Sequence, residues 1–181
     1  AHVTELDFSG KRVRLVSATG NKDDSETQWL HYDKLIVAVG VRHAYFGRND
    51  WESSAPGLKT LGDALDIRHR VLTAFERAEW TEDPDEQRAL LTFVVVGAGP
   101  TGVELAGALA EIAFQSVRRD FRQADTRSAR VILVEGGPEV LGTFPEPLQH
   151  SARNQLESLG VEVRNGVRVT DVNGEGVMLG N

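Results

Sequence analysis

The sequence contains no cysteine among its 181 residues. This absence excludes a disulfide framework, a thiolate metal site, a cysteine nucleophile and a redox-active pair of thiols within the chain. Basic residues are also in the minority, with 20 Lys and Arg against 27 Asp and Glu and a net charge of −7. An acidic chain with a pI of about 5.2 is not expected to have nucleic acid or an anionic membrane surface as its main partner.

Long hydrophobic runs are missing as well. The longest stretch without a charged residue, 89–103, is interrupted by three glycines and a proline and is too short to span a bilayer. The first residues do not resemble a signal peptide, so a cytoplasmic location is expected. No metal site is expected either, because no two histidines have HxH or HxxxH spacing. The histidines are His2, His31, His43, His69 and His150.

The first part of the chain has the sequence of β-strands. Residues 3–8 and 13–16 alternate between apolar and polar around the pair Ser9-Gly10, which predicts a hairpin. The polar stretch 20–27 predicts a loop. The run 35–39 is apolar on both faces and ends at Gly40, a pattern typical of a buried strand.

From residue 61 the apolar residues recur at helical spacing as far as residue 78, and the acidic segment 81–87, which contains a proline, is expected to be a loop. The rest of the chain alternates between strands and helices, which predicts an α/β fold with a parallel sheet. Strands are expected at 92–96, 131–134 and 161–163, helices at 103–117 and 148–159, a charged connector at 118–129, and a final hairpin from 167–169 and 177–179.

A glycine-rich motif, Gly97-Ala98-Gly99-Pro100-Thr101-Gly102, lies between an apolar strand that is expected to be buried and a helix. In a GxGxxG motif the first glycine allows a tight turn and the second lets the backbone approach a pyrophosphate, while the third lets the helix pack closely on the strand. Pro100 and Thr101 suit the start of the helix. The motif therefore predicts a dinucleotide site, although the same sequence could form a tight structural turn.

Glu135 ends the next apolar strand, where a dinucleotide site needs an acid to bind the ribose diol. It lies 33 residues after Gly102 instead of about 20, because a long helix and the connector intervene. The alternative is an acid that merely ends a strand. Residues 136–144 contain no Lys or Arg to bind a 2′-phosphate, so NADH is expected to be preferred over NADPH.

Glu104 is a charged residue on an otherwise apolar helix, two residues after Gly102. An acid in the first turn of a helix is favoured by the helix dipole. Because its neighbours are apolar, its carboxylate is expected to be desolvated. The alternative to a dipole-favoured acid is therefore a functional carboxylate that lies close to a bound dinucleotide.

Together these residues resemble the flavoproteins with two dinucleotide-binding domains, and most of all the type II NADH dehydrogenases (NADH:quinone oxidoreductases). The resemblance is carried by the segments 32–40, 58–64, 96–107 and 131–135. It implies a Rossmann-like NAD(P)-binding domain inserted in an FAD domain of the same type, with a small antiparallel β-meander. Residues 1–59 would then be a segment of the FAD-binding domain and residues 60–181 the NADH-binding domain.

The resemblance also implies roles for single residues. Glu104 matches the family's glutamate beside the nicotinamide and the flavin, which makes it the candidate catalytic residue. Glu135 matches the ribose-binding acid and Val169 an apolar residue of the adenine pocket. Ala38, Val39 and Gly40 match the end of a strand that passes near FAD. The family's FAD-binding glycine turn does not precede Ala1, so the chain is interpreted as a fragment that alone is expected to be inactive and not to retain FAD.

The implied function is transfer of a hydride from NADH to FAD and then of electrons to a quinone. The parent protein is expected on the cytoplasmic face of the membrane, which it would contact only through regions outside this chain. Two alternatives remain open. One is an NADH-dependent reductase of the same fold that serves another acceptor, as in ferredoxin or nitrite reductases, and the other is a non-catalytic module that senses NADH.

Overall fold

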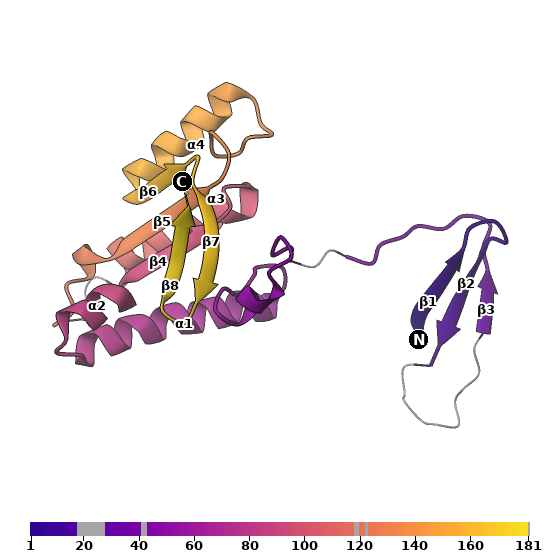
Figure 1. Ribbon diagram of the computed structural model, residues 1–181, viewed down its shortest axis with the longest axis horizontal. Helices are drawn as coiled ribbons and strands as arrows, with labels where there is room; N and C mark the ends of the chain where they lie inside the picture. Colours follow the sequence, from indigo (N-terminus) through magenta and orange to yellow (C-terminus); the bar gives the residue numbers. More distant parts are fainter. Residues whose placement is uncertain (18–27, 41–42, 118–119, 122, 181) are drawn as a thin grey trace. The chain divides into compact units, whose positions relative to one another are not determined.

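The computed structural model describes residues 1–17, 28–40, 43–117, 120–121 and 123–180. The chain divides into two compact units, residues 1–41 and 42–181 (Figure 1). The assignment of residues 1–59 and 60–181 to FAD and NADH domains is a functional division and stays a prediction.

The first unit contains an antiparallel sheet with the order β1-β2-β3. Its strands are β1 (His2–Asp7), β2 (Arg12–Val16) and β3 (Gln28–His31). In the β1–β2 turn the Asp7 carboxylate accepts hydrogen bonds from the amide of Gly10 and the Nε of Arg12, both at 2.8 Å. The predicted hairpin is therefore confirmed, whereas the loop expected at 20–27 lies outside the described residues.

The apolar run 35–39 is not a strand in this structure, and that prediction is wrong for this chain. Ile36 and Val39 are 88% and 87% exposed. A strand that is apolar on both faces is buried only when neighbouring strands and covering layers enclose it, and no described residue pairs with this run. Its sequence has the composition of a buried strand, but this chain supplies no sheet for it.

The second unit is built on a parallel sheet with the order β4-β5-β6, as the alternation of strands and helices predicts. The strands are β4 (Thr92–Val96), β5 (Arg130–Glu135) and β6 (Val161–Asn165). β5 has a neighbour on each side, and residues 131–134 are all buried. β4 is an edge strand, so only Val95 is buried and Val96 is 44% exposed. The expectation that the strand before the glycine motif is buried holds for that one residue.

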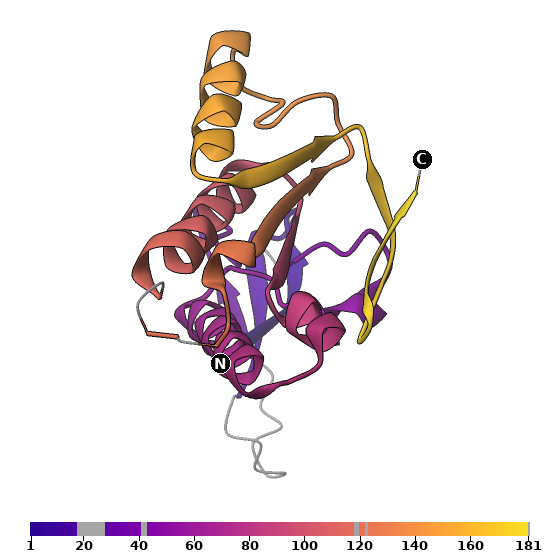
Figure 2. The ribbon, with the colours of Figure 1, turned by 90° about the vertical axis from the view of Figure 1, so that its left-hand side faces the viewer.

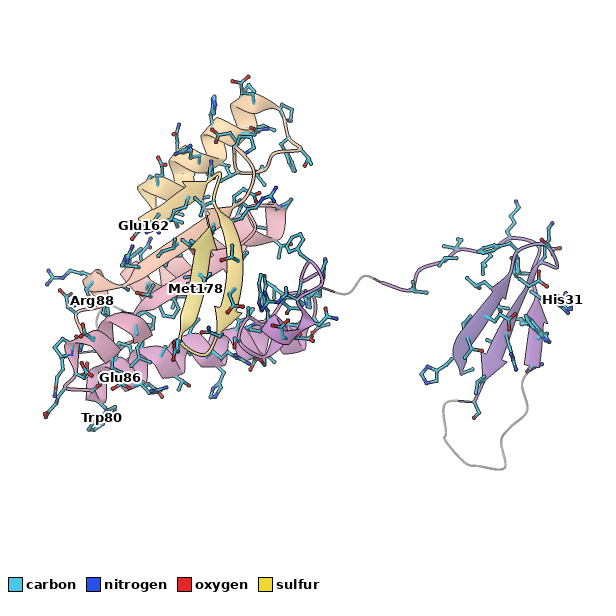
Figure 3. The ribbon with its side chains drawn as sticks, in the orientation of Figure 1. His31, Trp80, Glu86, Arg88, Glu162 and Met178 are labelled. Carbon is cyan, nitrogen blue, oxygen red and sulfur yellow. The ribbon has the colours of Figure 1, made fainter. Side chains whose placement is uncertain are left out.

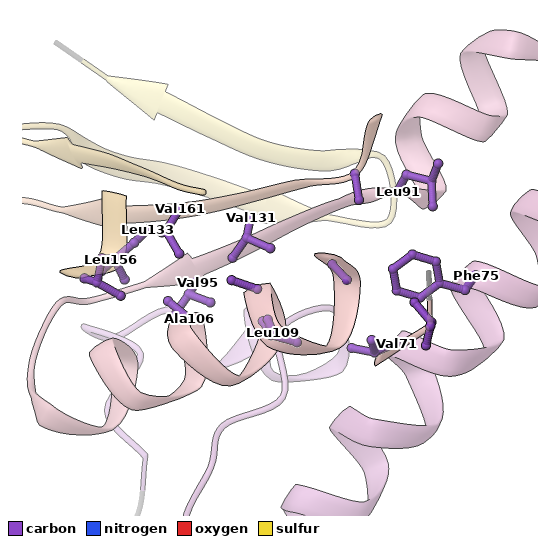
Figure 4. Packing of buried hydrophobic residues seen from close by; sticks show 14 of the residues in the cluster. Val71, Phe75, Leu91, Val95, Ala106, Leu109, Val131, Leu133, Leu156 and Val161 are labelled. Carbon is purple, nitrogen blue, oxygen red and sulfur yellow. The ribbon is translucent and has the colours of Figure 1, made fainter. Parts of the chain in front are cut away.

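Three helices cover one face of this sheet, and a hairpin lies on the other face (Figure 2). The helices are α1 (Leu61–Trp80), α3 (Pro100–Glu111) and α4 (Glu146–Ser158), and the hairpin consists of β7 (Arg168–Asn173) and β8 (Gly176–Gly180). Figure 4 shows α3 packed against the sheet, with Leu109 facing Phe75 and Val71 of α1. The core therefore holds β4, β5 and the start of α3 in fixed positions.

The short segment between α1 and β4 is a helix, α2 (Pro84–Leu90), where the sequence predicted a loop over 81–87. Its acidic residues suit a helix start, because Asp83 caps the amide of Asp85 and Pro84 occupies the first turn. The predicted helix 103–117 is α3 followed by a π-helical turn, η2 (Ile112–Ser116). Of the connector, η3 (Thr126–Ser128) is described, and residues 118, 119 and 122 lie outside the described part. A further 3₁₀ turn, η1 (Asn49–Ser53), precedes α1.

Candidate functional site

The glycine motif forms a tight turn between β4 and α3. Gly97 has a φ of +95°, a conformation that L side chains rarely adopt, and its amide donates to the carbonyl of Val134 on β5 at 2.8 Å. A Cβ at Gly102 would overlap the carbonyl oxygen of Gly97. The turn is thus hydrogen-bonded to the neighbouring strand. The first turn of α3 packs so closely on Gly97 that only a glycine fits at position 102.

The other side of the turn is open. A Cβ placed on Gly97 or Gly99 would meet no heavy atom within 4 Å. Gly99 is the N-cap of α3 and has no side chain to accept from the first amides of the helix, and Pro100 follows in the first turn. The amides of Thr101 and Gly102 therefore begin a 12-residue helix with no side-chain cap. An open space in front of uncapped helix amides fits the pyrophosphate of a dinucleotide.

Glu135 lies beside this turn, as expected from its place at the end of β5. One carboxylate oxygen accepts the amide of Ala98 and the other the amide of Gly137, both at 2.7 Å. Between Gly102 and Glu135 the chain forms the rest of α3, η2, the connector and β5, which returns parallel to β4 and places Glu135 beside the turn. Each carboxylate oxygen keeps a second lone pair, with which it can accept a ribose hydroxyl.

The loop after β5 closes over the turn from the other side. The amide of Leu141 donates to the carbonyl of Ala98 at 2.8 Å, and Leu141 has a φ of +51°, which is uncommon for a residue other than glycine. Gln149 of α4 donates to the carbonyl of Phe144 at 2.7 Å and holds the end of this loop. Ala98, which is buried, therefore has both of its peptide groups hydrogen-bonded.

The start of β7 reaches the same edge. The amide of Val167 donates to the carbonyl of Glu135 at 3.0 Å, and that of Gly166 to the carbonyl of Gly137 at 2.8 Å. Val169, expected at the adenine pocket, is half-buried on β7. Its neighbour Arg168 was missed by the sequence reasoning, which sought basic residues only at 136–144. The signal was present in the sequence, because Arg168 stands between the two valines of a predicted strand.

Glu104 is exposed on α3, so the desolvation expected from its apolar neighbours is wrong for this chain. The residues of α3 that face the core are Ala106, Leu109 and Ala110, and the helix presents Glu104 to solvent near its glycine-rich end. Its predicted role in catalysis stays a prediction, as do the roles of Ala38, Val39 and Gly40, which belong to the first unit.

Within the described ranges no cluster of His, Asp or Glu side chains has a composition suited to a metal ion. No described helix combines the length and apolar character needed to cross a membrane.

Residues 1–181, the whole chain, match the family of pyridine nucleotide-disulphide oxidoreductases. The chain belongs to that family. Among curated members it is 44% identical over 176 residues to the type II NADH:quinone oxidoreductase Ndh of Mycobacterium tuberculosis. It is also 33% identical over 174 residues to the external alternative NAD(P)H-ubiquinone oxidoreductase B4, mitochondrial, of Arabidopsis thaliana. These alignments include 97% and 95% of the chain but only 37% and 30% of the two relatives, so it spans about a third of their length.

Two solved structures share the fold of this chain. The structure of NDH2 from Plasmodium falciparum in complex with NADH matches with a TM-score of 0.81 and 25% identity, over 98% of this chain and 35% of that chain. A ferredoxin reductase from Rhodopseudomonas palustris has a TM-score of 0.60 at 20% identity, over 98% of this chain and 36% of that one, and so shares the fold alone. The predicted α/β architecture with small antiparallel sheets is confirmed.

Proposed function

We propose that this chain is the NADH-binding part of a flavin-dependent NADH:quinone oxidoreductase of type II. The observation that carries the proposal is the contact between Glu135 and Ala98, which joins a ribose-type acid to a glycine turn at the start of a helix. The names of the Mycobacterium and Plasmodium relatives support the choice of NADH and quinone over other members of the family.

The residues of the second unit have the properties needed to bind and orient the nucleotide. The pyrophosphate would be held by the amides at the start of α3, in the open space beside Gly99. The ribose hydroxyls would donate hydrogen bonds to the carboxylate of Glu135, and the adenine would pack against Val169. Because both peptide groups of Ala98 are already bonded, the turn keeps its shape without the nucleotide.

The bound pair NADH and FAD would supply the chemistry, with a hydride passing from one to the other and electrons leaving to a quinone. Glu104, near the same end of α3, would orient the nicotinamide end of the nucleotide. The exposed apolar run 35–39 supports an FAD domain around the first unit, because that composition is stable only inside a sheet. Ala38, Val39 and Gly40 would then pass near the flavin.

A quinone is dissolved in the membrane, so the parent protein would work at the membrane surface. We place it on the cytoplasmic face, as a peripheral protein, with the membrane contact made outside this chain. The net charge of −7 supports a membrane contact outside this chain, because an acidic chain as a whole is not attracted to anionic lipid.

The proposed nucleotide site is tested by titrating the chain with NADH. Gly102→Ala places a Cβ on the carbonyl oxygen of Gly97, so it should distort the turn and reduce NADH affinity at least about tenfold, the effect of losing one or two charge-assisted hydrogen bonds. Gly107→Ala is the matched control on the same helix, since its Cβ would meet only the Leu159 side chain at 3.9 Å. Equal affinities of the two variants would contradict the site.

The proposed reaction is tested on the flavin-containing protein that includes this chain. Rapid reduction of the flavin by NADH, followed by reoxidation by a soluble quinone, is expected. Reoxidation by a ferredoxin but not by a quinone would favour the reductase alternative. Tight NADH binding without flavin reduction would favour the sensing module.

A further inference from the structure

Arg168 lies against the residue that follows the ribose-type acid. A Cβ built on Gly136 would stand 3.5 Å from the Cγ of Arg168, so the aliphatic part of this side chain borders the space in which a side chain at position 136 would lie. Two backbone hydrogen bonds fix this arrangement, from Val167 to the carbonyl of Glu135 and from Gly166 to that of Gly137. β7 thus places an arginine beside the residue that follows the acid, and in nucleotide sites of this type an arginine near the acid can accommodate a 2′-phosphate.

Arg168 is exposed, and its guanidinium has no hydrogen bond or ion pair within the described part of the chain. The other arginines of the neighbouring elements are paired: Arg130 and Arg164 with Glu162, and Arg153 with Glu157. The acid of the adjacent loop, Glu139, is engaged by Arg153 at 3.5 Å and by Asn165 at 3.2 Å. Among the described arginines of these elements, Arg168 is therefore the one that is free to bind an external anion.

Glu135 and Arg168 have opposite effects on a phosphate at the ribose 2′ position. The carboxylate repels it, whereas a guanidinium offers paired donors that suit a phosphate. Resting on the proposed function, we propose that Arg168 is a specificity-determining residue that binds the 2′-phosphate of NADPH. The site therefore prefers NADH through Glu135 but also takes NADPH as a second, weaker nucleotide.

The proposal is tested by measuring the dissociation constants of NADH and NADPH for the chain and for Arg168→Gln. Loss of one charge-assisted contact should reduce the affinity for NADPH roughly tenfold. The affinity for NADH, which has no 2′-phosphate, should fall less than about twofold. Arg168→Lys keeps the charge without the planar fork and should recover part of the loss. Because Arg168 is exposed on the first residue of a strand, these variants are expected to fold, and far-UV circular dichroism checks this.

Arg88→Gln is the matched control. It removes the same charge from α2, which precedes β4 and so lies at the end of that strand opposite the glycine turn (Figure 3). The control should change neither affinity. If Arg88→Gln lowers the affinity for NADPH as much as Arg168→Gln does, the effect of Arg168 comes from its net charge alone and the proposal is overturned. The proposal is also overturned if Arg168→Gln reduces the affinities for both nucleotides equally, or reduces neither. A chain that binds neither nucleotide contradicts the proposed function itself.

Discussion

Glu135 has a structural role at the end of β5 and, in the proposed site, a second role in ligand selection. Its carboxylate accepts two backbone amides, Ala98 and Gly137, and thereby joins the glycine turn to the loop after β5. In the proposed site the same negative charge would face the ribose and would disfavour a 2′-phosphate by Coulomb repulsion. A residue that both shapes a site and selects its ligand should show both effects when it is changed.

Glu135→Gln is therefore expected to narrow the preference for NADH. The wild-type chain should bind NADH more tightly than NADPH. Removing the negative charge should reduce the ratio of the NADPH to NADH dissociation constants about tenfold, which corresponds to about 1.4 kcal/mol. Fluorescence titration of both nucleotides measures this ratio. Tighter binding of NADPH than NADH to the wild-type chain would contradict the role of Glu135.

Glu104→Gln separates catalysis from stability. Because Glu104 is exposed, the free energy of unfolding should change by no more than about 0.5 kcal/mol. If its charge orients the nicotinamide or stabilises the ring as the hydride leaves, flavin reduction in the flavin-containing protein should slow roughly tenfold to a hundredfold. Affinity for ADP-ribose should stay the same, because the adenosine half is held elsewhere. Stopped-flow absorbance of the flavin gives the rate, and an unchanged rate would end the catalytic interpretation.

At the scale of elements, α1 begins with a reciprocal cap. The Thr60 hydroxyl accepts the amide of Asp63 at 3.1 Å, and the Asp63 carboxylate accepts the amides of Thr60 and Lys59 at 2.8 and 2.9 Å. These amide donors hold the pKa of Asp63 below its ordinary value of 3.8. A lowered pKa means that the carboxylate stabilises the fold above the ordinary pKa, and that this contribution is lost as the pH falls through the folded value.

Asp63→Asn should therefore destabilise the chain at neutral pH but not in acid. Loss of a helix cap costs about 1 kcal/mol of unfolding free energy. The contribution of the charge declines once the pH falls below the ordinary pKa of 3.8 and is lost as the pH passes the lower folded pKa, so the difference between the two proteins should shrink towards zero there. Urea unfolding followed by circular dichroism at several pH values measures the difference. A constant difference across the pH range would show that the charge of Asp63 is irrelevant.

Elements whose signals are local were predictable from the sequence. The helical spacing from residue 61 and the alternation of strands and helices from Thr92 gave the right order, since periodicity reflects which face of each element is buried. The run 35–39 failed because burial of a strand depends on neighbours that no local pattern contains. The segment 81–87 failed for a different reason: its acids and proline were interpreted as a break, whereas they cap α2.

The candidate site was predictable only in part for a similar reason. The glycine turn and Glu135 occupy positions of a known motif, so the residue types and their order along the chain were enough to predict that they lie close together. Arg168 reaches the site through the pairing of β5 with β6 and the bonds of residues 166 and 167 to the β5 loop. Such a contact between distant residues follows from the tertiary arrangement and not from spacing. The exposure of Glu104 likewise follows from which side of α3 packs on the sheet.

At the scale of the whole molecule, the two units should differ in what they bind. The first unit contains a meander and the exposed run 35–39, and residues 1–59 contain no GxGxxG turn to hold the phosphates of FAD. The purified 181-residue chain should therefore carry no flavin and show no NADH oxidation, while it still binds NADH. Absorbance between about 370 and 450 nm, the flavin bands, checks this, and a stoichiometric flavin signal would contradict it.

The segment before α1 is attached to the hairpin of the second unit. The guanidinium of Arg48 contacts the Asp171 carboxylate at 2.6 Å, and the indole Nε1 of Trp51 donates to the same oxygen at 3.2 Å. Arg48 also lies 4.9 Å from the centre of the Trp51 ring. Residues 48–51 therefore belong structurally with β7, although the functional division at 59/60 would count them with the FAD segment.

The double bonding of Ala98 has a consequence for how fast the nucleotide is captured. Its amide is fixed by Glu135 and its carbonyl by Leu141, so the turn does not have to be ordered when the ligand arrives. Binding that requires no rearrangement loses little conformational entropy and is limited mainly by the frequency of well-oriented collisions. Dissociation is then the step through which affinity varies among nucleotides. A site of this kind would capture its nucleotide rapidly, which would suit the proposed function, in which an oxidised product is released and a reduced nucleotide is rebound in every cycle.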